Sequence, residues 1–276
     1  MENTGKIEIE FSNQDLWRLI VPLVIEQLLA IAVGLCDSIM VSQVGEAAIS
    51  AVSLVDTVNV LLINAFSALA TGGAVIVGQY LGRRELQKAG HSGAQLLLFM
   101  GEVSLLVMAV FYLAKGFVLG VVFGSIEPDV AAYADTYYMI VQASIPFLAL
   151  YSAGAALFRV MGNSKISMYV SLLMNLINVV GNAVLIFGFR MGVEGVAIPT
   201  LVSRAVAAAV VLVLLYRPNL PLQVERVTWK HDPYVVKTFC GLVCPMDWRA
   251  VCSSWERSCC YPRFRFWVPR LWLPMP

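Results

Sequence analysis

Six long apolar runs dominate the chain between residues 16 and 216, and short polar segments separate them. A helix needs about 20 apolar residues to cross the ~30 Å hydrocarbon core of a bilayer. Lipid offers no hydrogen-bond partners, so a spanning segment must satisfy its own backbone groups, as a helix does. The sequence therefore predicts an all-α integral membrane protein, a six-transmembrane-helix bundle with spans at roughly 16–40, 50–80, 92–114, 132–158, 166–189 and 194–216.

Composition supports a lipid environment. Hydrophobic residues make up 59% of the chain and charged residues only 13%. Soluble domains carry roughly 25% charged residues, so this chain has too few to cover a water-facing surface. We expect the lipid bilayer to be its main partner. The net charge of +1 gives no sign of a nucleic-acid-binding surface.

Lysine and arginine gather in alternate loops between the predicted spans. The opposite loops hold only Lys115 and Arg190, whereas the basic set comprises Lys6, Arg83, Arg84, Lys88, Arg159, Lys165, Arg217, Arg226, Lys230 and Lys237. Because basic loops stay on the cytoplasmic side, we expect a multi-pass protein of the plasma or inner membrane with a cytoplasmic N-terminus. The expected organisation is a cytoplasmic segment 1–15, a transmembrane lobe 16–216, a cytoplasmic linker 217–240 and a tail 241–276.

Helix-breaking residues fall inside several of these spans. We expect the helices to face protein or a cavity where backbone groups are freed, at Pro22, Pro146, Pro199 and Gly72-Gly73. Aromatic side chains near span ends favour the membrane interface, and this pattern includes Tyr137 and Tyr138.

Acidic side chains inside the apolar runs are the first candidates for function. They are Glu26, Asp37, Asp56 and Glu102. An ionisable group at mid-membrane costs about 2.5–3.5 kcal/mol on insertion scales, so such groups tend to face an interior. Glu26 and Asp37 are eleven residues apart, close to three turns, and share a helix face. They would line a pathway for a cation or proton. Alternatively, Asp37 is a solvated acid at the span's end, and Asp56 and Glu102 are interfacial or packed polar groups.

Three asparagines, Asn175, Asn178 and Asn182, lie on one stripe of the fifth span. Asparagine binds substrates or cations through its carbonyl oxygen, and it also joins helices by hydrogen bonds worth about 0.6 kcal/mol on average. The spacing leaves both roles open. The sequence contains no catalytic triad order, HExxH motif or P-loop, so we expect no catalytic residues, no metal site, no cofactor and no enzyme.

Four ordered motifs resemble the multidrug and toxic compound extrusion (MATE) transporters, in particular the NorM-like branch. They are VGLCDSIMVSQVG (33–45), GGAVIVGQYLGRR (72–84), FRVMGNSK (158–165) and NLINVVGNAVLIFG (175–188). The resemblance covers about residues 10–240 and corresponds to the N-terminal lobe only. It implies a twelve-helix protein of two six-helix lobes, which exports small organic cations or metabolites by alternating access in exchange for Na+ or H+.

The resemblance also assigns roles to residues. Asp37 stands where the family has a first-helix acid tied to cation coupling, and Asn178 matches a polar position of the cavity. Asn182 stands where some members carry an acid, which leaves the choice between Na+ and H+ open. We therefore expect ion coupling at Asp37, Asn178 and Asn182, and a substrate cavity that includes Glu26, Asn175 and Asp56.

The tail 241–276 has a different composition, with four of the six tryptophans and four of the six cysteines. Its cysteine spacing fits no paired metal motif. Reading the codons one base out of frame gives apolar residues where the genetic code fixes the outcome. We therefore interpret the tail as the product of a frame shift.

Three functions follow from these patterns. The first is a secondary drug:cation antiporter. The second is a lipid-linked oligosaccharide flippase of the same superfamily, for which Arg204 is the only basic candidate in the sixth span. The third is a truncated half-molecule that either does not transport alone or forms a homodimer.

Overall fold

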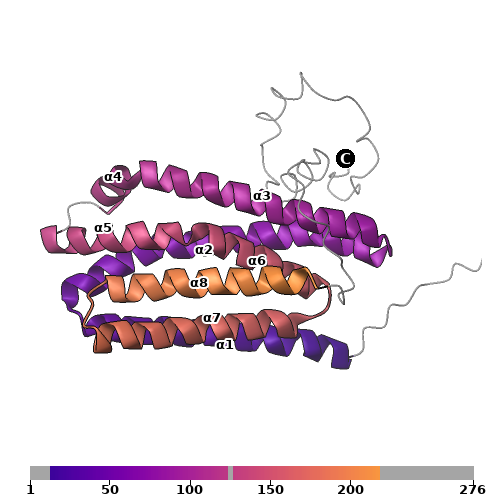
Figure 1. The fold of residues 1–276 in the computed structure, drawn as a ribbon, viewed down its shortest axis with the longest axis horizontal. Helices are drawn as coiled ribbons and strands as arrows, with labels where there is room; N and C mark the ends of the chain where they lie inside the picture. The colour runs from indigo at the N-terminus through magenta and orange to yellow at the C-terminus, as the bar shows by residue number, and fades with distance from the viewer. Residues whose placement is uncertain (1–12, 124–126, 218–276) are drawn as a thin grey trace, which may run out of the picture.

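The computed structural model describes residues 13–123 and 127–217, which are almost entirely helical (Figure 1). No strand occurs in these ranges. The helices are α1 (Asn13–Ser42), α2 (Glu46–Gly82), α3 (Leu86–Leu113), α4 (Lys115–Phe117), the π-helix η1 (Val118–Val122), α5 (Pro128–Ala143), α6 (Ile145–Val160), α7 (Ser164–Ala183), the π-helix η2 (Val184–Gly188) and α8 (Glu194–Leu215). The predicted segment 1–15, linker 217–240 and frame-shifted tail 241–276 lie almost wholly outside the described residues.

The six predicted spans are confirmed by helix length and composition. Five helices of the described residues are long and apolar enough to cross a membrane, and α5 and α6, bent by 43° where they meet, pass the same test when they are counted together as one span. The bend falls at Ser144, just before Pro146 in the first turn of α6. Proline lacks the backbone N–H that would continue the helix, and its ring disfavours helical geometry in the preceding residue. Pro22 and Pro199 lie within continuous helices instead, and both are buried.

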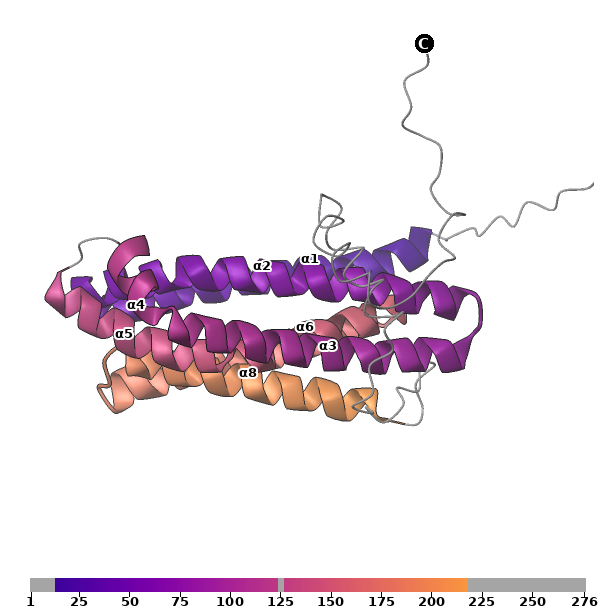
Figure 2. The same ribbon diagram turned by 90° about the horizontal axis from the view of Figure 1, so that it is seen from above.

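The long helices run side by side along one axis, and their connections lie at the two ends of the bundle (Figures 1 and 2). The α1–α2, α3–α5 and α7–α8 connections share one end, and the α2–α3 and α6–α7 connections share the other. Helix α1 packs mainly against α7. Its outer face exposes Leu28, Ile31, Leu35 and Ile39, as a lipid-facing helix does.

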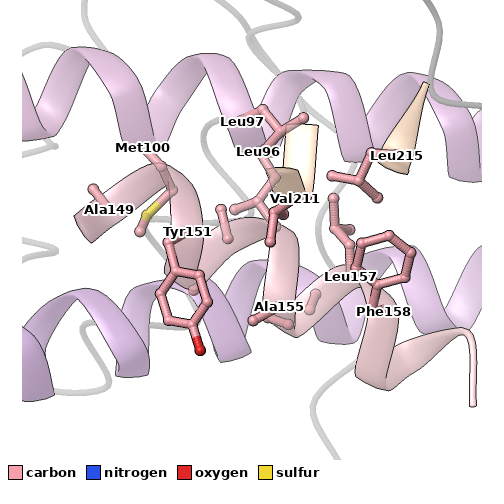
Figure 3. Packing of buried hydrophobic residues seen from close by; sticks show 14 of the residues in the cluster. Leu96, Leu97, Met100, Ala149, Tyr151, Ala155, Leu157, Phe158, Val211 and Leu215 are labelled. Carbon is pink, nitrogen blue, oxygen red and sulfur yellow. The ribbon is translucent and has the colours of Figure 1, made fainter. Parts of the chain in front are cut away.

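An apolar core joins α2, α3, α6 and α8, and it includes Leu96, Leu157, Phe158 and Val211 (Figure 3). Small residues let these helices approach closely. A Cβ atom added at Gly73 would collide with Leu96, and one at Gly154 would collide with Val211. Glycine at these two positions therefore permits the close approach of the helices.

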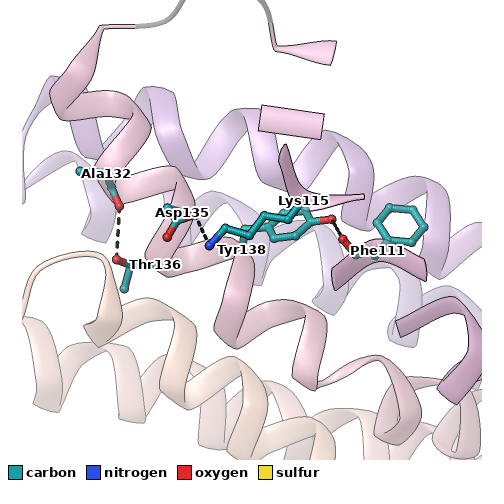
Figure 4. Close-up of polar contacts among 6 residues, drawn as sticks. All are labelled: Phe111, Lys115, Ala132, Asp135, Thr136 and Tyr138. Carbon is teal, nitrogen blue, oxygen red and sulfur yellow. Dashed lines mark hydrogen bonds and ion pairs between the residues drawn. The ribbon is translucent and has the colours of Figure 1, made fainter. Parts of the chain in front are cut away.

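Polar contacts tie α5 to the end of α3 and to α4, which follows it (Figure 4). Lys115 Nζ lies 2.5 Å from Asp135 Oδ1, and the Tyr138 hydroxyl donates to the Phe111 carbonyl at 2.9 Å. Tyr137 and Tyr138 are both buried within the protein. The expectation that they face the membrane interface is therefore wrong, because their hydroxyl groups have partners inside the bundle.

Candidate functional site

A hydrogen-bonded network joins α1, α7 and α8 around Asp37. The Asn182 amide nitrogen, Nδ2, donates to Asp37 Oδ1 at 2.6 Å and to Asn178 Oδ1 at 3.2 Å. Asn178 Nδ2 in turn donates to the Thr200 hydroxyl oxygen at 3.1 Å. Asn178 and Asn182 reach the same network because residues four apart share one face of a helix. Thr200 donates its own proton to the Val196 carbonyl, 2.9 Å away, so its oxygen is free to accept.

The electrostatics of this network favour a positive ligand. No lysine or arginine among the described residues forms an ion pair with Asp37. Asn182 is 0% exposed, and its Oδ1 atom has no hydrogen-bond partner in the described part of the protein. A buried acceptor without a partner costs roughly 1–3 kcal/mol, and hard cations bind carboxylate and amide oxygens. The network therefore presents oxygen atoms that a small cation or a proton donor would satisfy.

A small cavity adjoins Asp37 and contains a second carboxylate, Asp56. Its volume is about 80 Å³, and its lining comprises Gly34, Asp37, Ser38, Val41, Ile49, Val52, Ser53, Asp56, Tyr137 and Val196. One water needs about 10–15 Å³ of such volume, whereas pockets for drug-sized ligands measure about 300–1,000 Å³. In this conformation the cavity therefore fits an ion with a few waters, not a large organic cation.

Asp56 belongs to a separate set of contacts between α2, α5 and α8. The Tyr137 hydroxyl donates to Asp56 Oδ1 at 3.0 Å. Arg204 is buried, and its Nη1 donates to Ser144 Oγ at 2.7 Å and to Asn59 Oδ1 at 3.3 Å. The positive charge of Arg204 also attracts the Asp56 carboxylate. Arg204 thus holds α8 against the bend between α5 and α6, and it does not line the cavity.

Glu26 and Asn175 lie apart from this cavity, since neither is among its lining residues. Glu26 accepts hydrogen bonds from Tyr151 on α6 and Ser167 on α7, at 3.3 and 3.2 Å. Asn175 is buried on α7, and its Nδ2 has no partner in the described protein. Among the predicted site residues, the structure thus joins Asp37, Asn178 and Asn182 directly and places Asp56 across the same cavity.

Two polar partners in the site were not predicted from the sequence, Thr200 and Tyr137. Thr200 follows Pro199, and only the packing of α8 on α7 brings its hydroxyl to Asn178. Tyr137 comes from α5, 81 residues after its partner Asp56. A polar side chain next to a proline inside an apolar run was the one available signal for Thr200.

The MatE family model matches residues 22–184 of this chain. The uncharacterized transporter YisQ of Bacillus subtilis is 29% identical over 229 residues, which are 80% of this chain and 50% of YisQ. The multidrug export protein MepA of Staphylococcus saprophyticus is 25% identical over 72% of this chain and 44% of its own length. The chain thus spans about half the length of these curated relatives.

Solved structures show the same fold. A MOP superfamily transporter from Pyrococcus furiosus superimposes with a TM-score of 0.77 and 19% identity, over 83% of this chain and 51% of that protein. The described helices therefore correspond to one lobe of such a transporter. Since the family model covers more than half of the sequence, the chain belongs to the MATE family, whose members are membrane transporters and not enzymes.

Proposed function

We propose that this chain forms the N-terminal lobe of a secondary active transporter, which exports small organic cations in exchange for Na+ or H+. The observation that carries the proposal is the Asp37 carboxylate, bonded to a buried amide whose own oxygen has no partner among the described residues. Relatives named as multidrug export proteins support the substrate class. The predicted organisation, with a lobe at 16–216 and a cytoplasmic N-terminus in the plasma membrane, is part of the same proposal.

The coupling ion would act on the contact between α1 and α7. The 2.6 Å bond from Asn182 to Asp37 is a charge-assisted hydrogen bond, which is roughly twice as strong as a neutral one. A proton on Asp37 would weaken this bond by removing the charge. A Na+ ion would instead be held by the carboxylate together with the Asn182 and Asn178 oxygens. Either ion shifts the conformational equilibrium only as far as it binds the two states with different affinity.

Exchange between ion and substrate follows from competition for negative charge. Asp37 and Asp56 share one cavity, and an organic cation would be attracted to the same carboxylates that hold the coupling ion. If both cannot bind together, inward movement of the ion drives outward movement of the substrate. Glu26 and Asn175 remain predicted members of the substrate cavity, which would have to open wider than in this conformation.

The sequence also suggested two other functions, a lipid-linked oligosaccharide flippase and a truncated half-molecule. A flippase for anionic lipid-linked sugars would use basic cavity residues, but Arg204 is buried against Ser144 and Asn59, so we do not propose it. Activity of this chain alone would require a second lobe, which a homodimer of two six-helix bundles would supply.

Binding of tetraphenylphosphonium, a lipophilic organic cation, to the purified full chain tests the proposal without requiring transport. We expect Na+ or acid to weaken binding competitively, and Asp37→Asn to reduce that ion dependence at least about tenfold, which corresponds to 1.4 kcal/mol. Asp135→Asn is the matched control, because Asp135 is paired with Lys115 at the end of the bundle. If Asp37→Asn binds the cation with the same ion dependence as the control, Asp37 does not carry the coupling ion.

A further inference from the structure

One arginine lies inside the bundle, in the middle of α8. The other lysines and arginines of the described residues lie near helix ends or in the connections between helices. Arg204 is only 8% exposed. An ionisable group within a membrane span is costly, and such groups usually pair with one another or with polar groups in the interior. The positive charge of Arg204 therefore calls for a negative partner within the protein.

The direct contacts of Arg204 are with neutral side chains. Its Nη1 atom donates to Ser144 Oγ at 2.7 Å and to Asn59 Oδ1 at 3.3 Å. Both partners are buried, and neither carries a charge. No carboxylate among the described residues forms a direct ion pair with Arg204. These contacts fix the position of the guanidinium group but leave its charge uncompensated.

The Asp56 carboxylate supplies the negative charge through a bridging amide. Asn59 lies three residues after Asp56 on α2, so the two side chains are neighbours on the helix surface. The Asn59 amide group hydrogen-bonds to the Asp56 carboxylate, and its oxygen accepts from Arg204. The guanidinium and the carboxylate also attract each other. Asp56 and Arg204 thus form a charge pair that is bridged by Asn59.

The surroundings of Asp56 support an ionised carboxylate. Burial by itself disfavours a charged group, whereas hydrogen-bond donors and a nearby positive charge favour it. Asp56 has the Tyr137 hydroxyl as a donor at 3.0 Å, the Asn59 amide as a second donor, and Arg204 as the nearby positive charge. Charges in a protein interior interact more strongly than in water. Asp56 and Arg204 therefore compensate each other.

The two acids of the cavity consequently differ in charge balance. Asp37 and Asp56 both line the cavity, and its other lining side chains are uncharged. Asp37 accepts from the neutral amide of Asn182, and no lysine or arginine among the described residues forms an ion pair with it. The cavity therefore contains two carboxylates, of which only that of Asp37 lacks a compensating positive charge.

We propose that Arg204 sets the charge of this cavity: by compensating Asp56 through Asn59, it leaves Asp37 as the one uncompensated carboxylate, so that the cavity selects singly charged cations over doubly charged ones. Arg204 does not line the cavity, so it acts through its charge and not by contact with a ligand. The Coulomb energy of a bound cation is proportional to its charge, so a second uncompensated carboxylate would favour a dication. The selection of cations rests on the function proposed above, whereas the charge pair does not.

Four forms of the full chain separate the charge of Arg204 from its structural role. They are the native chain, Asp56→Asn, Arg204→Met and the double variant; methionine is unbranched like arginine but carries no charge. The cavity should become less negative in Asp56→Asn and more negative in Arg204→Met, and the double variant should restore the native charge. A purely structural role predicts instead that the double variant adds the defects of the single ones. If Arg204→Met alone does not fold, the comparison of Asp56→Asn with the double variant gives the same test.

A thiol in the cavity wall reports this charge without any need for transport. Ser53 lines the cavity and is exposed, so Ser53→Cys is added to all four forms in lipid nanodiscs. Cationic and anionic methanethiosulfonate reagents label the thiol, and peptide mass spectrometry locates the adduct. We expect the ratio of cationic to anionic labelling rates to fall at least about fivefold with Asp56→Asn and to rise at least about fivefold with Arg204→Met. The double variant should return the ratio to its native value.

Two organic cations of similar shape test the selection by charge. N-methyl-4-phenylpyridinium carries one positive charge, and methyl viologen carries two on a similar pair of rings. We expect Arg204→Met to raise the affinity for methyl viologen relative to N-methyl-4-phenylpyridinium at least about tenfold, and the addition of Asp56→Asn to reverse this gain. Lys115→Met combined with Asp135→Asn is the matched control, because it removes a charge pair at the end of the bundle, and it should change neither ratio.

The two experiments refute different parts of the proposal. The charge pair is refuted if Asp56→Asn leaves the labelling ratio unchanged, or if the double variant keeps the ratio of Asp56→Asn. The selection of cations is refuted if Arg204→Met folds and binds the two organic cations with the native ratio of affinities. Failure of Asp37 in the tetraphenylphosphonium experiment would refute the coupling role of Asp37 but would leave the expected labelling ratios unchanged.

Discussion

Helices α7 and α8 approach each other closely beside the Asp37 network, at Gly181 and Pro199. A Cβ atom on Gly181 would lie 2.7 Å from Pro199 Cβ and 3.0 Å from its Cγ. A proline ring cannot rotate away as a flexible side chain does. Gly181→Ala must therefore push the two helices apart by about 0.7 Å, because ordinary carbon contacts begin at about 3.4 Å.

This displacement should lower the stability of the protein and weaken ion-dependent binding at the Asp37 network. Overpacking of this kind destabilises by about 1–3 kcal/mol, whereas alanine in place of glycine within a helix gains roughly 0.5–1 kcal/mol. We expect a net loss of roughly 1 kcal/mol, within a range of about 0–2.5 kcal/mol. The Asn178–Thr200 bond, 3.1 Å long between α7 and α8, would lengthen beyond hydrogen-bond range if the helices separate along it, so ion-dependent binding should weaken as well.

Thermal unfolding in detergent measures the first effect, and tetraphenylphosphonium binding measures the second. Gly101→Ala is the matched control, since its added Cβ would meet only Leu150 Cδ2, at an ordinary 3.9 Å. It should be neutral or stabilising. If Gly181→Ala melts as high as Gly101→Ala and binds normally, the close helix contact does not hold the network in place.

Two further substitutions test, by thermal unfolding, the polar contacts of Asp56 and Arg204 between α2, α5 and α8. Tyr137→Phe removes the hydroxyl that donates to Asp56 and should destabilise by about 1–3 kcal/mol, since a partly buried carboxylate loses a donor. An equal melting temperature for the exposed control Tyr216→Phe would contradict this. Ser144→Ala removes the acceptor 2.7 Å from buried Arg204. It should destabilise by a similar 1.5–3 kcal/mol or so, the range for bonds to charged groups, and a loss below about 0.5 kcal/mol would show that Arg204 finds another partner.

The sequence predicted the spans well because lipid imposes a length and a composition on them. It did less well with bends. Pro22, Pro146 and Pro199 are equivalent as sequence signals, yet only Pro146 accompanies a break. The difference lies in tertiary context: the Pro199 ring packs on Gly181 of the neighbouring helix, which leaves room for it, and no pattern along one helix reveals its neighbour.

In the candidate site, too, features that depend on one helix were predictable, and features that depend on packing between helices were not. The inward position of Asp37 and of the asparagines of α7 could be expected from spacing along single helices and from the cost of polar groups in lipid, whereas their roles stay predictions from the family resemblance. Thr200 and Tyr137 could not be expected, since each depends on which helix packs nearby and in which register. The shared cavity of Asp37 and Asp56 is likewise a property of the α1–α2 pair.

The pairing of the first helix with late helices has a consequence for biosynthesis. The hydrogen-bond partners of Glu26 lie 125 and 141 residues further along the chain, and the partner of Asp37 lies 145 residues further along. At a synthesis rate of about 5–20 residues per second, about 7–30 s pass after α1 is made before α7 exists. During that interval the newly inserted helix holds two acids in lipid without their final partners, at a cost of up to about 2.5–3.5 kcal/mol each. Chaperones or insertion machinery that shelter α1 over these seconds would therefore determine how much protein reaches the native bundle.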